Sequence, residues 1–274
     1  MNQKPRSFTR WQAPADLAEK QRTPEKLTAG VPLAKVIPRK LEAVPELVML
    51  TDKRSMAAEE FRRLKTMLEK EGDDSPQAIV VTSSAPDEGK STVSANLALA
   101  FAVEKLGEVL LVDADLRRPS IHNWLSPAPQ LGVSDILEGR TELDHAVLSL
   151  ENSPLKILPA GTVPREPADL ISAEAAKELF ANLRRQFQRI IVDTPPVIPF
   201  SDADIIGSLC DGSVLVARSG QTEKAAFQQA QSLMTSSRIL GVVLNDTEFA
   251  WADWNRRSRK YYNAYYYENY RNEK

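Results

Sequence analysis

Short aliphatic runs alternate with longer helical stretches through most of the chain. The runs contain almost only Val, Ile and Leu, which is typical of strands covered on both faces of a parallel sheet. They lie at residues 79–81, 109–112, 190–192, 214–216 and 240–244. The stretches between them predict helices at 91–106, 172–187 and 222–237. This alternation predicts an α/β fold with a doubly wound, mainly parallel sheet, which binds its ligand at the carboxyl ends of the strands.

The pattern divides the chain into three parts. Prolines without a sustained period predict a largely irregular leader, and an amphipathic helix with Phe61, Leu64 and Leu68 on one face opens the part that follows. The last part has little aliphatic material and is expected to be a flexible tail. We expect a leader at 1–50, a domain at 51–250 that begins with the helix at 55–70, and a tail at 251–274.

Composition narrows the class of protein. The chain has 274 residues, 42% of them apolar and 26% charged, with a net charge of −2. This allows one sizeable core, excludes disorder throughout, and predicts no global attraction to nucleic acid or anionic lipid. The single cysteine, Cys210, excludes an internal disulfide framework and is expected to be a small buried apolar residue.

No apolar run approaches the roughly 18 residues that span a bilayer. The first residues also lack the apolar stretch of a signal peptide. We therefore expect a cytoplasmic protein that reaches a membrane only through a partner.

The first aliphatic run leads into a loop typical of phosphate binding. Residues 83–92 read SSAPDEGKST and continue into an apolar helical stretch, whose first backbone N–H groups can cradle phosphate oxygens. Lys90 would reach the β- and γ-phosphates, and the Ser91 hydroxyl would join the Mg²⁺ shell. Ser84 or Ala85 and Asp87 stand where such a P-loop commonly has glycine. The expected nucleotide-binding residues here are Asp87, Glu88, Gly89, Lys90, Ser91 and Thr92.

Two further aliphatic runs end in carboxylates. Asp113 and Asp115 follow the second run, and Asp193 ends the run at 190–192. One carboxylate of the first pair can hold Mg²⁺ through water, while the other can accept a proton from an attacking hydroxyl. Asp193 fits a Walker B pattern, in which a carboxylate steadies the metal shell. Together with the P-loop, these residues predict a site for a nucleoside triphosphate and Mg²⁺.

All six tyrosines of the chain lie in its last 14 residues. They are Tyr261, Tyr262, Tyr265, Tyr266, Tyr267 and Tyr270. Basic residues precede them, so stacking on nucleic acid or a general interaction tail is an alternative. Neither alternative explains why every aromatic residue is a tyrosine, whereas phosphoryl acceptance does, because it needs the phenolic hydroxyl. The cluster is therefore predicted to be a phosphoryl acceptor.

These features resemble the bacterial tyrosine kinases of capsule and exopolysaccharide synthesis, which have a P-loop NTPase-like fold. The likeness covers about residues 55–274 and rests on the P-loop, the VDADLRRP string at 112–119, the strand ending at Asp193 and the tyrosine tail. The resemblance implies an ATP-dependent protein-tyrosine kinase that phosphorylates its own tail between protomers. It further implies that tail phosphorylation regulates polymerisation and export of the polysaccharide.

The resemblance also implies roles for individual residues. Lys90, Asp113 and Asp115 would be catalytic, and Asp113 and Asp115 would share the proton-accepting and metal-organising roles. The residues expected at the metal are Ser91, Asp115 and Asp193. Asn245 is also expected to bind the nucleotide by facing its base, as similar positions do in related ATPases.

A helix with the pattern Glu-x-x-Arg-x-x-Arg joins protomers into rings in this family. Here Glu59 and Arg62 match the pattern, and Lys65 departs from it, losing the planar fork of arginine. The implied partners are further copies of the chain, a separate membrane-spanning activator of the polysaccharide co-polymerase type, and a phosphotyrosine phosphatase, but not nucleic acid. The activator would recruit the chain to the inner face of the cell membrane.

Two alternatives remain at this point. A partition or positioning ATPase would share the P-loop, but it usually carries a signature lysine where this chain has Ala85. A non-catalytic scaffold of polysaccharide export, switched by ATP, would bind the nucleotide and transfer nothing. A partition or positioning ATPase would also leave the tyrosine cluster unexplained.

Overall fold

The aliphatic runs form the centre of one mainly parallel sheet. The computed structural model describes residues 40–41, 44–69, 75–103, 108–150 and 153–247. Within them the strand order is β5-β6-β3-β7-β2-β8-β9, with β5 antiparallel to β6 and every other pair parallel. The strands are β2 (Ala78–Ser83), β3 (Val109–Asp113), β5 (Leu148–Ser149), β6 (Leu155–Leu158), β7 (Arg189–Asp193), β8 (Gly212–Arg218) and β9 (Ile239–Asn245). The predicted fold class and all five predicted strands are confirmed.

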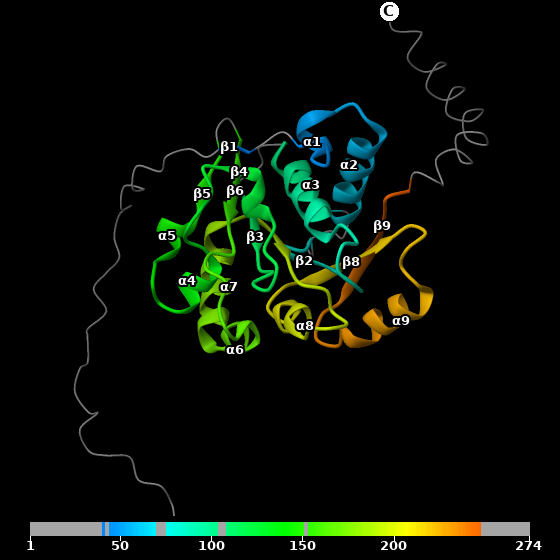
Figure 1. The fold of residues 1–274 in the computed structure, drawn as a ribbon. Helices are drawn as coiled ribbons and strands as arrows, with labels where there is room; N and C mark the ends of the chain where they lie inside the picture. Colours follow the sequence, from blue (N-terminus) through cyan, green and yellow to red (C-terminus); the bar gives the residue numbers. More distant parts are fainter. Residues whose placement is uncertain (1–39, 42–43, 70–74, 104–107, 151–152, 248–274) are drawn as a thin grey trace, which may run out of the picture. The chain divides into compact units, whose positions relative to one another are not determined.

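Helices cover both faces of this sheet (Figure 1). They are α1 (Val48–Thr51), α2 (Met56–Glu69), α3 (Lys90–Ala102), α4 (Val133–Leu137), α5 (Leu143–Ala146), α6 (Pro167–Ser172), α7 (Glu174–Gln186), α8 (Asp202–Gly207) and α9 (Lys224–Leu233). A 3₁₀ helix (Ile121–Trp124) and a two-stranded ribbon of β1 (Lys40–Leu41) and β4 (Leu125–Ser126) complete the described elements. The predicted helices correspond to α2, α3, α7 and α9, whereas α1, α4, α5, α6 and α8 were not predicted as separate elements.

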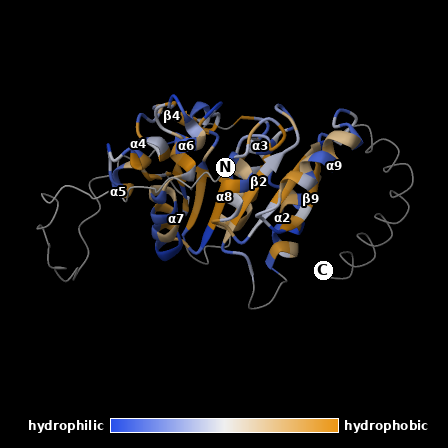
Figure 2. Ribbon diagram, turned by 90° about the horizontal axis from the view of Figure 1, so that it is seen from below, coloured by the Kyte–Doolittle hydropathy of each residue, from blue (hydrophilic) through white to orange (hydrophobic). Residues whose placement is uncertain are grey.

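Alternate residues of each central strand pack into different apolar layers, as the pleat of a strand requires. Ile79 and Val81 of β2 join the layer beneath α1, α2 and α3. Val80 joins the opposite layer with Leu183 of α7 and Ile206 of α8. Figure 2 shows hydrophobic residues concentrated in the strands and on the helix surfaces that face them.

The packed body begins before residue 51. Leu47 is fully buried and Met49 is 1% exposed, both in the layer with α3. Asn96 of α3 holds this segment by accepting a hydrogen bond from the Met49 N–H (3.1 Å) and donating one to the Glu46 carbonyl (2.8 Å). The segment lies within the stretch assigned to the leader, because its order comes from tertiary contact rather than from a period of its own.

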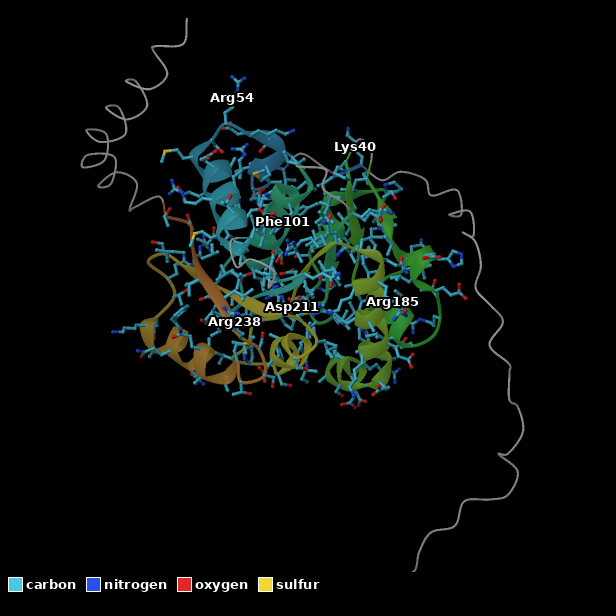
Figure 3. The ribbon with its side chains drawn as sticks, turned by 180° about the vertical axis from the view of Figure 1, so that it is seen from behind. Lys40, Arg54, Phe101, Arg185, Asp211 and Arg238 are labelled. Atoms are coloured by element: carbon cyan, nitrogen blue, oxygen red, sulfur yellow. The ribbon has the colours of Figure 1, made fainter. Side chains whose placement is uncertain are left out.

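One carboxylate ties three elements together at the amino edge of the sheet. Asp211, labelled in Figure 3, accepts hydrogen bonds from the Gln77 and Ala78 N–H groups at 2.8 Å, just before and at the start of β2. The same carboxylate pairs with Arg184 of α7 at 2.8 Å. Burial would raise the pKa of Asp211, but these hydrogen bonds outweigh it and hold the pKa below its usual value.

Cys210 is partly buried against the layer that contains α7, and burial raises the pKa of its thiol to about 12.

No helix among the described residues is both long and apolar enough to cross a bilayer.

Candidate active site

Three separate sequence motifs meet at the carboxyl edge of the sheet. The strand register places Asp113 directly beside Asp193, and β2, which leads into the P-loop, pairs with β7 on its other side. Parallel strands end at the same edge, so the fold brings the carboxylates to the loop that carries Lys90.

Two residues of the P-loop, Asp87 and Gly89, have a left-handed backbone. Gly89 has φ of +90°, and a Cβ there would stand 2.0 Å from the Asn245 amide nitrogen. That amide, at the end of β9, donates a hydrogen bond of 3.1 Å to the Glu88 carbonyl. Asp87 also lies in the left-handed region, with φ of +62°. Asp87 stands where P-loops commonly have glycine, and its backbone has the left-handed conformation that glycine adopts most easily. Asp tolerates this conformation better than most other residues.

Lys90 lies among the predicted carboxylates. Its ammonium donates a hydrogen bond of 2.7 Å to Asp115 and stands 3.9 Å from Asp193. Burial would lower the pKa of Lys90, but the charges of Asp193 and Asp115 outweigh it and raise the pKa. The lysine therefore stays protonated, as a residue that neutralises phosphate charge must.

Asp193 is fully buried and bonded to the start of α3. The Ser91 hydroxyl donates to one of its oxygens, and the Ser94 hydroxyl donates to the other at 3.2 Å. Burial raises the pKa of Asp193, and the nearby Lys90 opposes the rise. Ser91 and Asp193, both expected at the metal from the P-loop and Walker B patterns, are thus in direct contact.

The carboxylate that ends β3 and the one two residues after it have different surroundings. Asp113 is fully buried and accepts backbone N–H hydrogen bonds from Asp115, Ser120 and Ile121 at 3.1–3.2 Å. Burial and the charge of Asp193 raise the pKa of Asp113 to about 8. Asp115 instead faces Lys90 and accepts a hydrogen bond of 2.9 Å from the Arg118 N–H. Asp113 therefore shapes the loop, whereas Asp115 is directed toward the lysine.

These groups suit a magnesium nucleotide. Among the described residues no group of three or more His, Cys, Asp or Glu side chains forms a ready metal site. Mg²⁺ is commonly held by one or two carboxylates together with substrate phosphates, so such a set of residues is compatible with it. Ser91, Asp193 and Asp115 supply hard oxygen donors near Lys90, and the loop of residues 87–92 supplies backbone N–H groups.

Several contacts of the site were not predicted from the sequence. Arg117 makes a two-pronged ion pair with the fully buried Asp202 of α8, at 2.8 and 3.0 Å, and its guanidinium lies 4.0 Å from the ring centre of Phe200. The adjacent Arg-Arg-Pro letters mark a basic loop, but nothing near them indicates Asp202.

A second unpredicted set braces the P-loop from the β8–α9 side. The Thr222 hydroxyl donates to the Glu88 carboxylate, which also accepts from the Ser84 and Ala85 N–H groups at 2.8 and 3.0 Å. The Arg218 guanidinium donates a hydrogen bond of 3.2 Å to the Asp87 carbonyl. The nucleotide loop is thus held in shape by its own Glu88.

The remaining predicted residues lie apart from this cluster. Glu59 and Arg62 form an exposed ion pair of 2.8 Å on α2. Lys65 is 4% exposed, pairs with Glu69 at 2.8 Å and lies 5.9 Å from the ring centre of Phe101. Lys65 therefore offers little surface to another protomer, and an interface at this helix stays a prediction. The six tyrosines lie outside the described residues.

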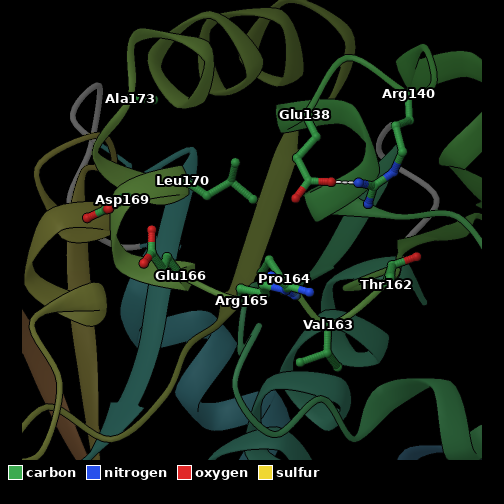
Figure 4. Close-up of a pocket in the computed structure, with 10 residues that line it drawn as sticks. All are labelled: Glu138, Arg140, Thr162, Val163, Pro164, Arg165, Glu166, Asp169, Leu170 and Ala173. Atoms are coloured by element: carbon green, nitrogen blue, oxygen red, sulfur yellow. Dashed lines mark ion pairs between the residues drawn. The ribbon is translucent and has the colours of Figure 1, made fainter.

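A cavity of about 550 Å³ lies between the end of α4, the loop after β6 and α6 (Figure 4). An ion pair between Glu138 and Arg140 crosses part of its wall. None of the predicted site residues lines it. Its lining residues are Glu138, Arg140, Thr162, Val163, Pro164, Arg165, Glu166, Asp169, Leu170 and Ala173.

Comparison with known proteins decides the family. No family model matches the chain. The chain is 35% identical over 202 residues to tyrosine-protein kinase YwqD of Bacillus subtilis, a match that covers 73% of this chain and 85% of that protein. The chain belongs to the bacterial tyrosine kinases. The kinase domain of the Escherichia coli tyrosine kinase ETK has a similar structure, with a TM-score of 0.68 and 30% identity over 74% of this chain and 80% of that one.

Two further similarities extend the comparison. This bacterial tyrosine kinase is 31% identical over 229 residues to the succinoglycan biosynthesis transport protein ExoP of Rhizobium meliloti, covering 79% of this chain but 29% of that protein. The septum site-determining protein MinD of Pyrococcus horikoshii, complexed with Mg-ADP, matches with a TM-score of 0.52 at 23% identity over 61% of this chain and 69% of that one, which shows the fold alone. Membership of the bacterial tyrosine kinases, at 35% identity to YwqD, sets aside the alternative of a positioning ATPase.

Proposed function

We propose that this bacterial tyrosine kinase transfers the γ-phosphoryl group of ATP to tyrosines of its own tail, between protomers. The observation that carries the proposal is the position of Lys90, whose ammonium is bonded to Asp115 and lies near the Ser91–Asp193 pair. Family membership at 35% identity supports the same activity. The acceptors proposed are Tyr261, Tyr262, Tyr265, Tyr266, Tyr267 and Tyr270.

Each residue of the site has a distinct part in this transfer. The loop of residues 87–92 binds the phosphates, and Lys90 leaves Asp115 to neutralise the β- and γ-phosphate oxygens. The phenolic oxygen forms a bond to the γ-phosphorus as the bond to the β-phosphate oxygen breaks, and ADP leaves. Asp115 accepts the phenolic proton, because its carboxylate is free once Lys90 turns to the nucleotide.

When bound, magnesium would supply further neutralisation of phosphate charge. Ser91 and Asp193 would hold it, with Asp115 nearby. Asp113 keeps the loop of residues 115–121 in place through its three backbone hydrogen bonds. Its burial supports a positioning role more than direct proton transfer.

The biological setting proposed is export of an extracellular or capsular polysaccharide. ExoP is named as a transport protein of succinoglycan biosynthesis, and most of its length lies outside the match with this chain. We propose that a separate membrane-spanning protein of the polysaccharide co-polymerase type docks this kinase at the inner face of the membrane. A phosphotyrosine phosphatase would reverse the modification.

Incubation of the purified chain with ATP and Mg²⁺, followed by phosphotyrosine detection and mass-spectrometric mapping, tests the activity. We expect phosphate on residues 261–270 of the wild type and none on Lys90→Met. Glu178→Gln, an exposed carboxylate of α7, is the matched control and should keep wild-type labelling. ATP binding by the wild type without any phosphotyrosine would contradict the proposal and favour the scaffold alternative.

A further inference from the structure

The last strand of the sheet carries an uncovered apolar row. Val242 is 49% exposed and Leu244 is 57% exposed, although both lie in a strand. The register pairs them with Leu215 and Ala217 of β8, which are 1% and 7% exposed. Paired residues of neighbouring strands point to the same face of a sheet. On this face of the sheet the apolar side chains are therefore buried in β8 but exposed to solvent in β9. We call Val242 and Leu244 the edge patch.

The helix on this face stops short of the edge patch. Ala230 and Met234, on and just after α9, pack on Leu215 and complete a small apolar layer. The edge patch does not belong to that layer, and β9 is the terminal strand of the described sheet. Figure 1 shows α9 below the sheet with β9 running past it at the edge. Proteins usually cover or charge such an edge, because an open apolar strand invites association.

The chain leaves β9 at a fixed turn. Asp246 has φ of +55°, a conformation typical of turns, and Arg218 pairs with its carboxylate at 2.7 Å. The Asn245 carbonyl accepts a hydrogen bond of 2.8 Å from the Ser219 N–H. The exit of the following segment is thus held beside the edge patch.

The next residues have the composition that such a surface requires. The segment 248–254 reads EFAWADW and contains Phe249, Trp251 and Trp254, whereas the charged run 256–260 follows it. Seven residues reach at most about 25 Å, and the return from Asn245 to Val242 is three strand residues, about 10 Å. The segment is long enough to fold back over the edge patch.

We propose that segment 248–254 of the same chain covers the edge patch, with Trp251 and Trp254 against Val242 and Leu244. The aromatic segment would then anchor the root of the tyrosine tail to β9. The tyrosines themselves would begin beyond the charged run, free to be presented to a partner site. This inference concerns packing of the chain and goes beyond phosphoryl transfer.

Tryptophan fluorescence of the full-length chain tests the proposal without nucleotide. Replacing Trp11→Phe and Trp124→Phe leaves emission from Trp251 and Trp254 alone. We expect emission at the short wavelength of a buried indole, and a shift toward the emission of indole in water when Val242→Ser and Leu244→Ser are added. Val163→Ser, an apolar residue 57% exposed on another loop, is the matched control and should cause no shift. Far-UV circular dichroism confirms that each variant is folded.

Measuring the emission at decreasing protein concentration distinguishes cover of the edge patch by the same chain from cover by a second copy. Emission that is independent of protein concentration supports cover by the same chain. A shift on dilution that follows dissociation of oligomers would overturn the proposal and assign the patch to a second copy. The proposal would also be overturned if the Trp11→Phe, Trp124→Phe chain emitted at the wavelength of indole in water. No shift on adding the serine substitutions would overturn it as well. Because ATP is absent throughout, these outcomes do not depend on whether the tail is phosphorylated.

Discussion

At the scale of single residues, the P-loop is shaped by two left-handed positions. Gly89 must be glycine for two reasons, its φ of +90° and the Asn245 amide that fills the place of a side chain. Asp87 shares the left-handed backbone without being glycine. Its carbonyl accepts a hydrogen bond from Arg218, which helps to hold this conformation.

Substitution of Asp87 measures that backbone constraint. We expect Asp87→Val to be less stable than Asp87→Gly by about 1–2 kcal/mol, because a left-handed backbone brings Cβ close to the carbonyl oxygen. Urea denaturation of the two variants gives the difference. Asp52 is exposed and has φ of −141°, so it serves as the control. Asp52→Val should not be less stable than Asp52→Gly. Equal stability of the Asp87 pair would contradict the assignment of strain.

At the scale of elements, one ion pair fastens the loop after β3 to α8. Arg117 is 25% exposed in its side chain and Asp202 is fully buried, so the carboxylate depends on the guanidinium for compensation. Asp202 is the first residue of α8, and α8 packs on α6. The loop that carries Asp115 is thereby fixed to the helices beyond it.

Removal of one partner should cost more than removal of both. We expect Arg117→Met to lose about 3 kcal/mol of unfolding free energy, because it leaves Asp202 buried without a counter-charge. The double variant Arg117→Met with Asp202→Asn should recover most of this loss. Urea denaturation of the single and double variants measures the coupling, and additive losses would show that the pair does not act as a unit. Arg118→Met, at the exposed neighbour, is the matched control.

At the scale of the whole molecule, the strand order puts the P-loop and the carboxylates Asp113, Asp115 and Asp193 at one edge, while the tyrosines come far along the sequence. The site is built from β2, β3, β7 and the ends of β8 and β9. The proposed acceptor tyrosines come only after residue 260. The proposed transfer between protomers requires the tail of one chain to enter the site of another.

Mixing two chains, neither of which can phosphorylate its own tail, tests transfer between protomers. One chain carries Lys90→Met and an intact tail, and the other keeps Lys90 but has its tail tyrosines changed to phenylalanine. The positions changed are Tyr261, Tyr262, Tyr265, Tyr266, Tyr267 and Tyr270. We expect phosphotyrosine on the Lys90→Met chain only in the mixture with ATP and Mg²⁺. A wild type that labels itself while the mixture stays unlabelled would show transfer within one chain.

The sequence predicted the parts of the fold that carry strong local patterns. The strands at the centre are continuous runs of Val, Ile and Leu because both of their faces are buried, and α3 and α7 are long enough to show their character. Shorter elements escaped prediction. The β6 run includes Lys156, and α8 has six residues, so tertiary packing rather than local pattern decides their structure.

The same distinction holds in the site. Asp113, Asp115, Asp193 and the P-loop could be predicted because each stands at the end of a buried aliphatic strand or just after it. The partners Asp202 and Thr222 were not, because they lie 85 and 134 residues from Arg117 and Glu88, and a single Asp or Thr has no signature of its own. The burial of Lys65 against Phe101 also depends on how two helices pack, which the pattern of α2 does not reveal.

The way Leu47 and Met49 pack has a practical consequence for anyone who trims this kinase to its catalytic part. A cut at residue 51 removes two side chains that fill the space against α3 and deprives Asn96 of both its backbone partners there. The loss of even one such leucine commonly costs about 2–5 kcal/mol. A shortened enzyme should therefore start upstream of Val44, or its low yield and early melting will be mistaken for properties of the kinase.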